Sequence, residues 1–226
     1  TTHHPELTNQ TTRDDTMAGT AIIHQAELNP SKLGMLDAWL QRQDWFDGTG
    51  PLSQIAYRFN DPEGEVGVET FIVTDAQAMQ WQVPVTYRGA PLEGAEEALI
   101  TTMQHSVLGE RWVYDGRFDE VYRAELVRTI VTGDTNASLS TGRTPDVRAV
   151  GSGAEDEAPE LVDVHVDDTG FGFADELGDT WRVEIARRFD DLADDLDDPD
   201  EGEVLTGVWL FEGQPRSAVL ARLTRA

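Results

Sequence analysis

The chain is organised around the stretch from Val83 to Ile130, which opens with the alternating segment Val83-Pro-Val-Thr-Tyr-Arg88. The turn-rich loop Gly89-Ala-Pro-Leu-Glu-Gly94 follows, and then the tract His105-Ser-Val-Leu-Gly-Glu-Arg-Trp-Val-Tyr-Asp-Gly116. Alternation of apolar and polar residues predicts a strand in the first segment, and a turn followed by a strand in the tract. The stretch therefore predicts strands that are joined by tight turns and followed by a helix.

Two helices are expected, one on each side of these strands. The first is predicted from Pro30 to Arg42 and the second from Asp119 to Val131, because apolar residues recur at helical spacing in both. The predicted buried positions are Leu33, Leu36, Trp39 and Leu40 in the first helix and Tyr122, Leu126 and Ile130 in the second. Asp119 suits the N-cap of the second helix, and Gly133 suits its end.

Three strands are predicted between the helices, at Ile55–Asn60, Val66–Thr74 and Gln80–Tyr87, because apolar residues alternate there. The first two are separated by Asn60-Asp-Pro-Glu-Gly64, which is a turn sequence. A helix followed by a meander of strands predicts an α+β fold, in which helices pack on an antiparallel sheet. A strand-rich C-terminal half is expected to follow.

Composition divides the chain into four segments. Residues 1–20 are rich in Thr, Asp and His and predict a disordered tail. Residues 21–133 form the predicted α+β region, residues 134–160 a loop or linker, and residues 161–226 a β-rich C-terminal region. Within the last segment, the acidic run from Asp190 to Glu203 is expected to form the tip of a hairpin.

The chain is strongly acidic. Its 226 residues include 43 Asp plus Glu and 17 Lys plus Arg, a formal net charge of −26, and Lys32 is the only lysine. Such a surface repels phosphate backbones and anionic lipids, so neither nucleic acid nor a membrane is expected as a partner. The sequence has no Cys and no membrane-spanning apolar run, which favours a cytoplasmic protein. A GC-rich genome or adaptation to salt would explain the scarcity of lysine.

Motifs of common enzymes are absent from the sequence. It contains no Walker pattern and no kinase catalytic loop, and no Gly-rich loop precedes Lys32. The His residues at positions 3, 4, 24, 105 and 165 form no pair at the helical spacing of a zinc site, and no Gly-x-Ser-x-Gly motif occurs. The acidic run that starts at Asp194 departs from EF-hand spacing at Pro199. Neither a metal nor a cofactor is therefore expected.

One cluster of polar residues could take part in acid–base chemistry. It comprises His105, Glu110, Arg111, Tyr114, Asp115 and Asp119. A His beside carboxylates suits general acid–base catalysis, but structural ion-pair networks bring the same residue types together. We favour the structural interpretation, in which His105 hydrogen-bonds to the backbone or to a neighbouring carboxylate and lines no deep pocket. His105 and Arg111 are then expected to pair with Asp115 or Glu110, and Arg111 is expected near enough to Asp115 to pair across the following strand.

Two tracts carry a resemblance to a known family. The first comprises Leu33, Leu36, Trp39, Leu40, Gln43, Trp45, Phe46, Gly48 and Gly50. The second is Pro84-Val-Thr-Tyr-Arg-Gly-Ala-Pro-Leu-Glu-Gly94, followed by His105-Ser-Val-Leu-Gly and Arg111-Trp-Val-Tyr-Asp115. Together they resemble the N-terminal cap domain of actinobacterial maltokinases, and in particular stand-alone cap-like proteins associated with trehalose synthase and maltokinase. Asp47 and Thr49 replace a Gly and the Lys of the maltokinase pattern.

The resemblance covers roughly Ala21 to Gly133 and implies a cytosolic setting in trehalose, maltose and glycogen metabolism. Maltokinases carry their catalytic residues in a C-terminal lobe, which we expect this chain to lack. Our first hypothesis is therefore a non-catalytic accessory or regulatory partner of an enzyme of this metabolism. The alternatives are a small carbohydrate-binding module and an uncharacterised enzyme that uses the polar cluster. Candidate stacking platforms of such a module are Trp45, Trp81, Trp112 and Trp209.

Overall fold

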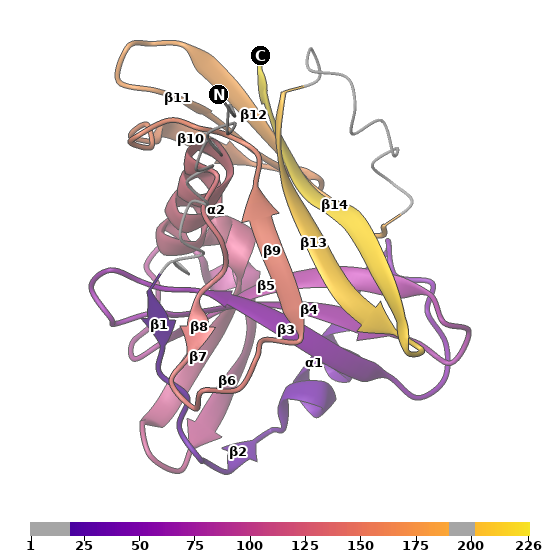
Figure 1. Ribbon diagram of the computed structural model, residues 1–226. Coiled ribbons are helices and arrows are strands. Elements are labelled where there is room, and N and C mark those ends of the chain that lie inside the picture. Colours follow the sequence, from indigo (N-terminus) through magenta and orange to yellow (C-terminus); the bar gives the residue numbers. More distant parts are fainter. Residues whose placement is uncertain (1–18, 190–201) are drawn as a thin grey trace, which may run out of the picture.

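The computed structural model describes residues 19–189 and 202–226 (Figure 1). The tail predicted over residues 1–20 lies outside the described residues up to position 18. The hairpin tip predicted from Asp190 to Glu203 lies outside them up to position 201, and so does the acidic run that starts at Asp194.

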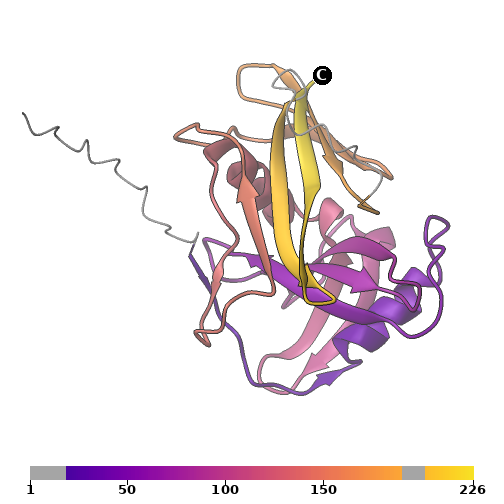
Figure 2. The ribbon, with the colours of Figure 1, turned by 45° about the vertical axis from the view of Figure 1, so that its right-hand side comes forward.

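The first sheet has six antiparallel strands in the order β2-β6-β7-β5-β4-β3 and curls into a half-barrel (Figure 2). Its strands are β2 (Leu28–Asn29), β3 (Ser53–Phe59), β4 (Gly67–Thr74), β5 (Gln80–Arg88), β6 (Leu99–His105) and β7 (Gly109–Asp115). The three strands predicted from alternation correspond to β3, β4 and β5. Short turns join β3 to β4 and β4 to β5, because polar residues and glycine separate the apolar runs. Gly64, in the first of these turns, has a φ of 73°.

The second sheet also has six antiparallel strands, in the order β10-β11-β12-β14-β13-β9. Its strands are β9 (Val147–Gly151), β10 (Val162–Val166), β11 (Gly170–Ala174), β12 (Thr180–Ile185), β13 (Glu203–Phe211) and β14 (Gln214–Arg225). A separate two-stranded parallel sheet joins β1 (Thr20–Ala21) to β8 (Ser138–Leu139). Both β8 and β9 come from residues 134–160, so this segment contributes an edge strand to the second sheet.

The helical elements are α1 (Lys32–Leu40), η1 (Glu96–Ala98), η2 (Gly116–Phe118) and α2 (Glu120–Thr132). The first helix begins two residues later than predicted, and its N-cap, Ser31, accepts from the Gly34 N–H at 3.1 Å. In α2 the prediction is confirmed: Asp119 caps the start, and Gly133 ends the helix with a φ of 66°. Within the described part of the chain, no helix combines the length and the hydropathy that crossing a bilayer requires.

Both faces of the first sheet are buried, each against a different layer. On one face α1 packs on strand residues; this cluster comprises Met35, Leu36, Trp39, Leu40, Phe71, Val73, Val83, Val85, Ile100, Met103 and Val113. On the other face, Val68 and Ile72 join the core formed with α2 and the second sheet. Figures 1 and 2 show this arrangement, with β13 and β14 on one side of the first sheet and α1 on the other.

The predicted α+β class is wrong, because the protein is mainly β. Strands account for 45% of the described structure and helices for 14%. The α1 helix was expected at about its observed place, but nine residues cover only part of one face of the first sheet. The second sheet covers the opposite face instead, and the fold is therefore two packed antiparallel sheets with α2 beside them.

A buried amide ties the two sheets together. Gln82 lies on β5, and its side-chain nitrogen donates to the carbonyl oxygens of Ala186 at 3.1 Å and Leu220 at 2.8 Å. The Tyr57 hydroxyl donates to the amide oxygen of Gln82 at 3.1 Å. Because every polar atom of this side chain has a partner, its burial costs little and fixes how the sheets are placed.

Candidate functional site

A cavity of about 390 Å³ lies at the N-terminal end of α1. One wall is residues 22–27, here called the strap, which runs from β1 to β2 without regular secondary structure (Figure 1). The strap is tied near both ends: the Ile23 N–H donates to Ser140 Oγ at 2.8 Å, and the Glu27 N–H donates to Ser106 Oγ at 3.0 Å. The other walls come from β3, β4, β5 and the β6–β7 hairpin.

Glu69, on β4, is the hydrogen-bond acceptor at the centre of this region. Lys32 Nζ donates to both of its carboxylate oxygens, at 2.8 and 2.7 Å. Arg58 Nη2 and the Tyr87 hydroxyl each donate to it at 2.8 Å. The only lysine of the chain therefore shares one buried carboxylate with an arginine and a tyrosine, and Lys32, Arg58 and Tyr87 also line the cavity.

The environment sets the pKa values of these groups. For Glu69, burial favours a higher pKa, but the charges and hydrogen bonds of Arg58 and Lys32 outweigh it and lower the pKa below 4.5. Burial lowers the pKa of Lys32 from 10.5 despite the attraction of Glu69. Burial, with Glu69 adding to it, raises the pKa of Tyr87 well above 10. Glu69 is therefore ionised and Tyr87 protonated at neutral pH.

Two histidines face each other at the rim, where the His24 and His105 rings meet edge to face with centroids 5.7 Å apart. His105 Nδ1 accepts from the N–H groups of Val107 at 3.2 Å and Leu108 at 3.0 Å. The neutral ring consequently carries its proton on Nε2. Burial, followed by the positive charges of His24 and Arg111, lowers the pKa of His105, which favours this neutral form.

The predicted backbone-bonding role of His105 is confirmed. The prediction that it lines no deep pocket is wrong, because His105 borders the cavity. The reason is tertiary: the strap, some 80 residues earlier in the chain, is held against the β6–β7 hairpin and encloses space beside it.

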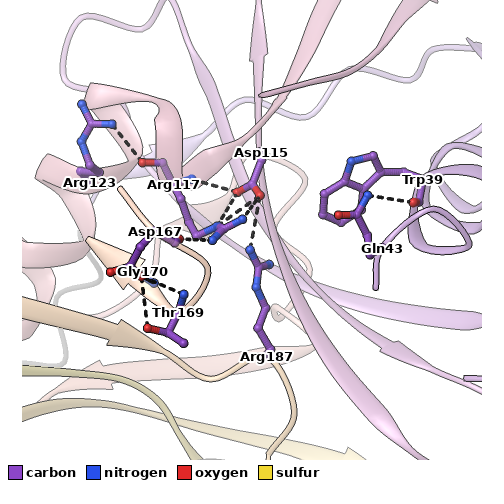
Figure 3. A network of polar contacts seen from close by, with 9 residues as sticks. All are labelled: Trp39, Gln43, Asp115, Arg117, Arg123, Asp167, Thr169, Gly170 and Arg187. Carbon is purple, nitrogen blue, oxygen red and sulfur yellow. Dashed lines mark hydrogen bonds and ion pairs between the residues drawn. The ribbon is translucent and has the colours of Figure 1, made fainter. Parts of the chain in front are cut away.

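A second polar centre surrounds Asp115 at the end of β7 (Figure 3). Its carboxylate accepts from Arg117 Nη2 at 2.7 Å and from Arg187 Nη2 at 3.3 Å. Arg117 Nη1 also donates to the backbone carbonyl of Asp167, whose side chain organises the turn between β10 and β11. Asp115 therefore links the first sheet to Arg187, which follows β12, and through Arg117 to the turn between β10 and β11.

The charges around Asp115 outweigh the effect of its burial. Burial alone favours a higher pKa, but the positive charge of Arg187 and the hydrogen bonds from Arg117 lower the pKa of Asp115 below 3.8. The Arg187 guanidinium also lies 4.8 Å from the centroid of the Trp45 ring. The expected pair between Arg111 and Asp115 is wrong, since Arg111 Nη2 donates to the Leu108 carbonyl at 2.6 Å instead.

The remaining members of the polar cluster each have different hydrogen-bond partners. Asp119 accepts from Arg88 Nε at 2.7 Å and from Thr86 Oγ1 at 2.7 Å while it caps α2. The Tyr114 hydroxyl accepts from the Leu92 N–H at 2.9 Å. Glu110 accepts from Gln104 Nε2 at 3.2 Å in an exposed position of the hairpin. Of the six residues, His105 and Arg111 line the cavity.

The candidate stacking residues differ in accessibility. Trp81 and Trp209 are 1% and 2% exposed, so neither presents a ring face to a ligand. Trp45 is half-buried and covered on one side by Arg187. Trp112 is half-buried and packs on the small cluster of Ala95, Ala98 and Tyr114.

Sequence reasoning did not select Lys32, Arg58, Glu69 or Tyr87 as a group. Two signals were available: Lys32 is the only lysine, and Glu69 is the only charged residue in the run Val68-Glu-Thr-Phe-Ile-Val73. A carboxylate at an inward-facing strand position needs a cationic or hydrogen-bonding partner. The identity of that partner depends on strand register and on α1, which the sequence pattern does not give. In the described ranges, 19–189 and 202–226, no three His, Cys, Asp or Glu residues are placed to hold a metal ion.

One segment of the chain matches a known protein family. Residues 39–119 match the maltokinase N-terminal cap domain. The match begins at Trp39 in α1, includes all of β3 to β7, and ends at Asp119, the N-cap of α2. No curated protein matches the chain.

Proposed function

We propose that this chain, which contains a maltokinase N-terminal cap-like domain, is an accessory or regulatory partner of an enzyme of trehalose, maltose or glycogen metabolism in the cytoplasm. One observation carries the proposal: the match coincides with a structural unit, the five long strands of the first sheet. The sequence offers no phosphate-binding loop and no kinase catalytic loop, so we assign this unit a binding role rather than phosphoryl transfer.

The β6–β7 hairpin is the part of this domain that suits contact with a partner. Val107 and Leu108 at its tip are 57% and 43% exposed. Exposed apolar side chains that lie together on a surface favour protein association, because covering them removes apolar area from water. The second sheet packs on the opposite face of the domain and leaves this tip uncovered.

Purified maltokinase and trehalose synthase from the same organism provide the test. Each enzyme is immobilised and the binding of this protein is measured by biolayer interferometry, followed by enzyme assays with and without it. We expect one of the enzymes to bind and its kcat or KM to change. The Val107→Asp variant should weaken binding at least about tenfold, which corresponds to about 1.4 kcal/mol.

Leu177→Asp is the matched control. Leu177 is 84% exposed in the turn after β11, outside the matched residues, and its substitution adds the same charge. This variant should bind like the wild type. Failure of both enzymes to bind would refute the proposed partnership, and an equal loss in the two variants would refute the hairpin as the contact.

A further inference from the structure

The cavity has the size of a small-molecule site. Its volume of about 390 Å³ falls within the range of roughly 300–1,000 Å³ that is typical of pockets for small organic ligands. Its lining combines apolar side chains, such as Leu28 and Met103, with the polar group around Lys32. Convergent polar groups in a largely apolar hollow are the usual composition of a ligand site.

Among the described residues, the polar group pairs two cations with one carboxylate. Lys32 and Arg58 are two cations that share the single carboxylate of Glu69. A carboxylate offers about four acceptor sites, and Glu69 receives four hydrogen bonds: two from Lys32 and one each from Arg58 and Tyr87. One negative charge therefore faces two positive charges in this group.

Other carboxylates on the lining do not replace it. Asp61 is occupied in its own turn, where it accepts from the N–H groups of Glu63, Glu65 and Val66. Glu65 is exposed. Arg111 adds a third cation at the rim. The described lining together with Glu69 thus carries three cations and three carboxylates, a larger share of cations than the 17 basic against 43 acidic residues of the whole chain.

Arg58 and His105 also have N–H donors left for a ligand. A guanidinium has five N–H donors, and Arg58 uses one of them on Glu69. The neutral His105 ring has its N–H at Nε2, because Nδ1 accepts from the backbone. Partly buried cations with spare donors are costly unless an acceptor compensates them.

We propose that this cavity binds a small organic anion, whose phosphate or carboxylate group is held by Arg58 and Lys32. Charge-assisted hydrogen bonds from a guanidinium fork suit both anions, and Arg binds them in a bidentate manner. The polar rim with His24 and His105 would contact the uncharged part of the ligand. This proposal does not depend on the partner proposed above, so each can fail alone.

Isothermal titration calorimetry with the full chain tests the site. The probes are inorganic phosphate, glucose 6-phosphate and citrate as anions, and glucose as the uncharged comparison. We expect saturable one-to-one binding of at least one anion and none of glucose. Arg58→Gln should weaken that binding at least about tenfold. The matched control Arg42→Gln removes the same charge at an exposed residue away from the cavity and should leave affinity within about twofold.

Because Arg58 pairs with buried Glu69, the fold of the Arg58→Gln variant is checked first by circular dichroism. Should it be unfolded, Arg58→Lys replaces it, since this variant keeps a cation beside Glu69 but removes the guanidinium fork, and the same loss is expected. Absence of binding by all three anions overturns the proposal. Binding of glucose as tight as that of glucose 6-phosphate, or an equal loss in Arg42→Gln, overturns it as well.

Discussion

Replacing Asp115 with Asn should destabilise the protein more than any other single-atom change at the junction of its two sheets. Asp115 is 3% exposed, and Arg117 and Arg187 are each 8% exposed. Asn preserves the shape and one acceptor, so the Arg117 N–H, which donates to Oδ1 at 3.1 Å, can keep its bond. The negative charge that compensates both guanidinium groups is lost.

The size of the stability loss follows from Arg117 and Arg187, which remain buried without the negative charge of Asp115. Removing one partner of a buried ion pair typically costs about 3–5 kcal/mol, because the remaining charge stays desolvated. The Trp45 ring, 4.8 Å from the Arg187 guanidinium, retains part of the stabilisation of that residue. Arg117 keeps its bond to the Asp167 carbonyl. We therefore expect a loss near the lower limit, about 3 kcal/mol.

Urea unfolding followed by circular dichroism measures this loss as a change in the midpoint at constant m-value. The matched control is Asp179→Asn, which breaks an Asp–Arg pair with Arg225 whose side chains are 39% and 64% exposed. That control should cost less than about 1 kcal/mol. Combining Asp115→Asn with Arg187→Met should recover part of the loss. A cost below about 1 kcal/mol for Asp115→Asn would refute the reasoning.

Four further predictions concern stability, each measured by urea or thermal unfolding. Gly151→Ala should cost at least about 1–3 kcal/mol, because its Cβ would lie 1.8 Å from the Thr129 carbonyl oxygen; wild-type stability would contradict this. His105→Ala should lower the free energy of unfolding by about 0.5–1.5 kcal/mol, because it removes one hydrogen-bond acceptor at an exposed turn. An unchanged unfolding midpoint would contradict this. The pKa values of Asp115 and Glu69 are lowered by folding, so their stabilisation is present above about pH 5 and lost as pH falls through the folded pKa values; equal midpoints at pH 7 and pH 3 would disprove it. Raising NaCl to about 1 M should increase the Tm by screening the charge of −26, and a flat or falling Tm would count against it.

Local signals in the sequence determined the elements of the cap-like domain. Alternation placed β3, β4 and β5, and helical spacing placed the buried face of α2, where Tyr122, Leu126 and Ile130 are 0% exposed. Asp119 and Gly133 marked the ends of α2, because an N-cap and a left-handed C-cap depend on residues within one turn. The tracts that resemble the maltokinase cap also lie within or beside the matched residues.

The layers and the polar centres were decided by tertiary structure. The α+β prediction failed because a period of two says that a strand has two faces but does not say what covers each of them. Asp115 and Arg187 are 72 residues apart, and Lys32 and Glu69 are 37 residues apart. Such pairs form only when strand register and sheet packing bring them together, since a buried charge is satisfied by whatever partner the fold places within about 3 Å. The sequence determines which residues are charged, but the packing of the sheets determines which of them form pairs.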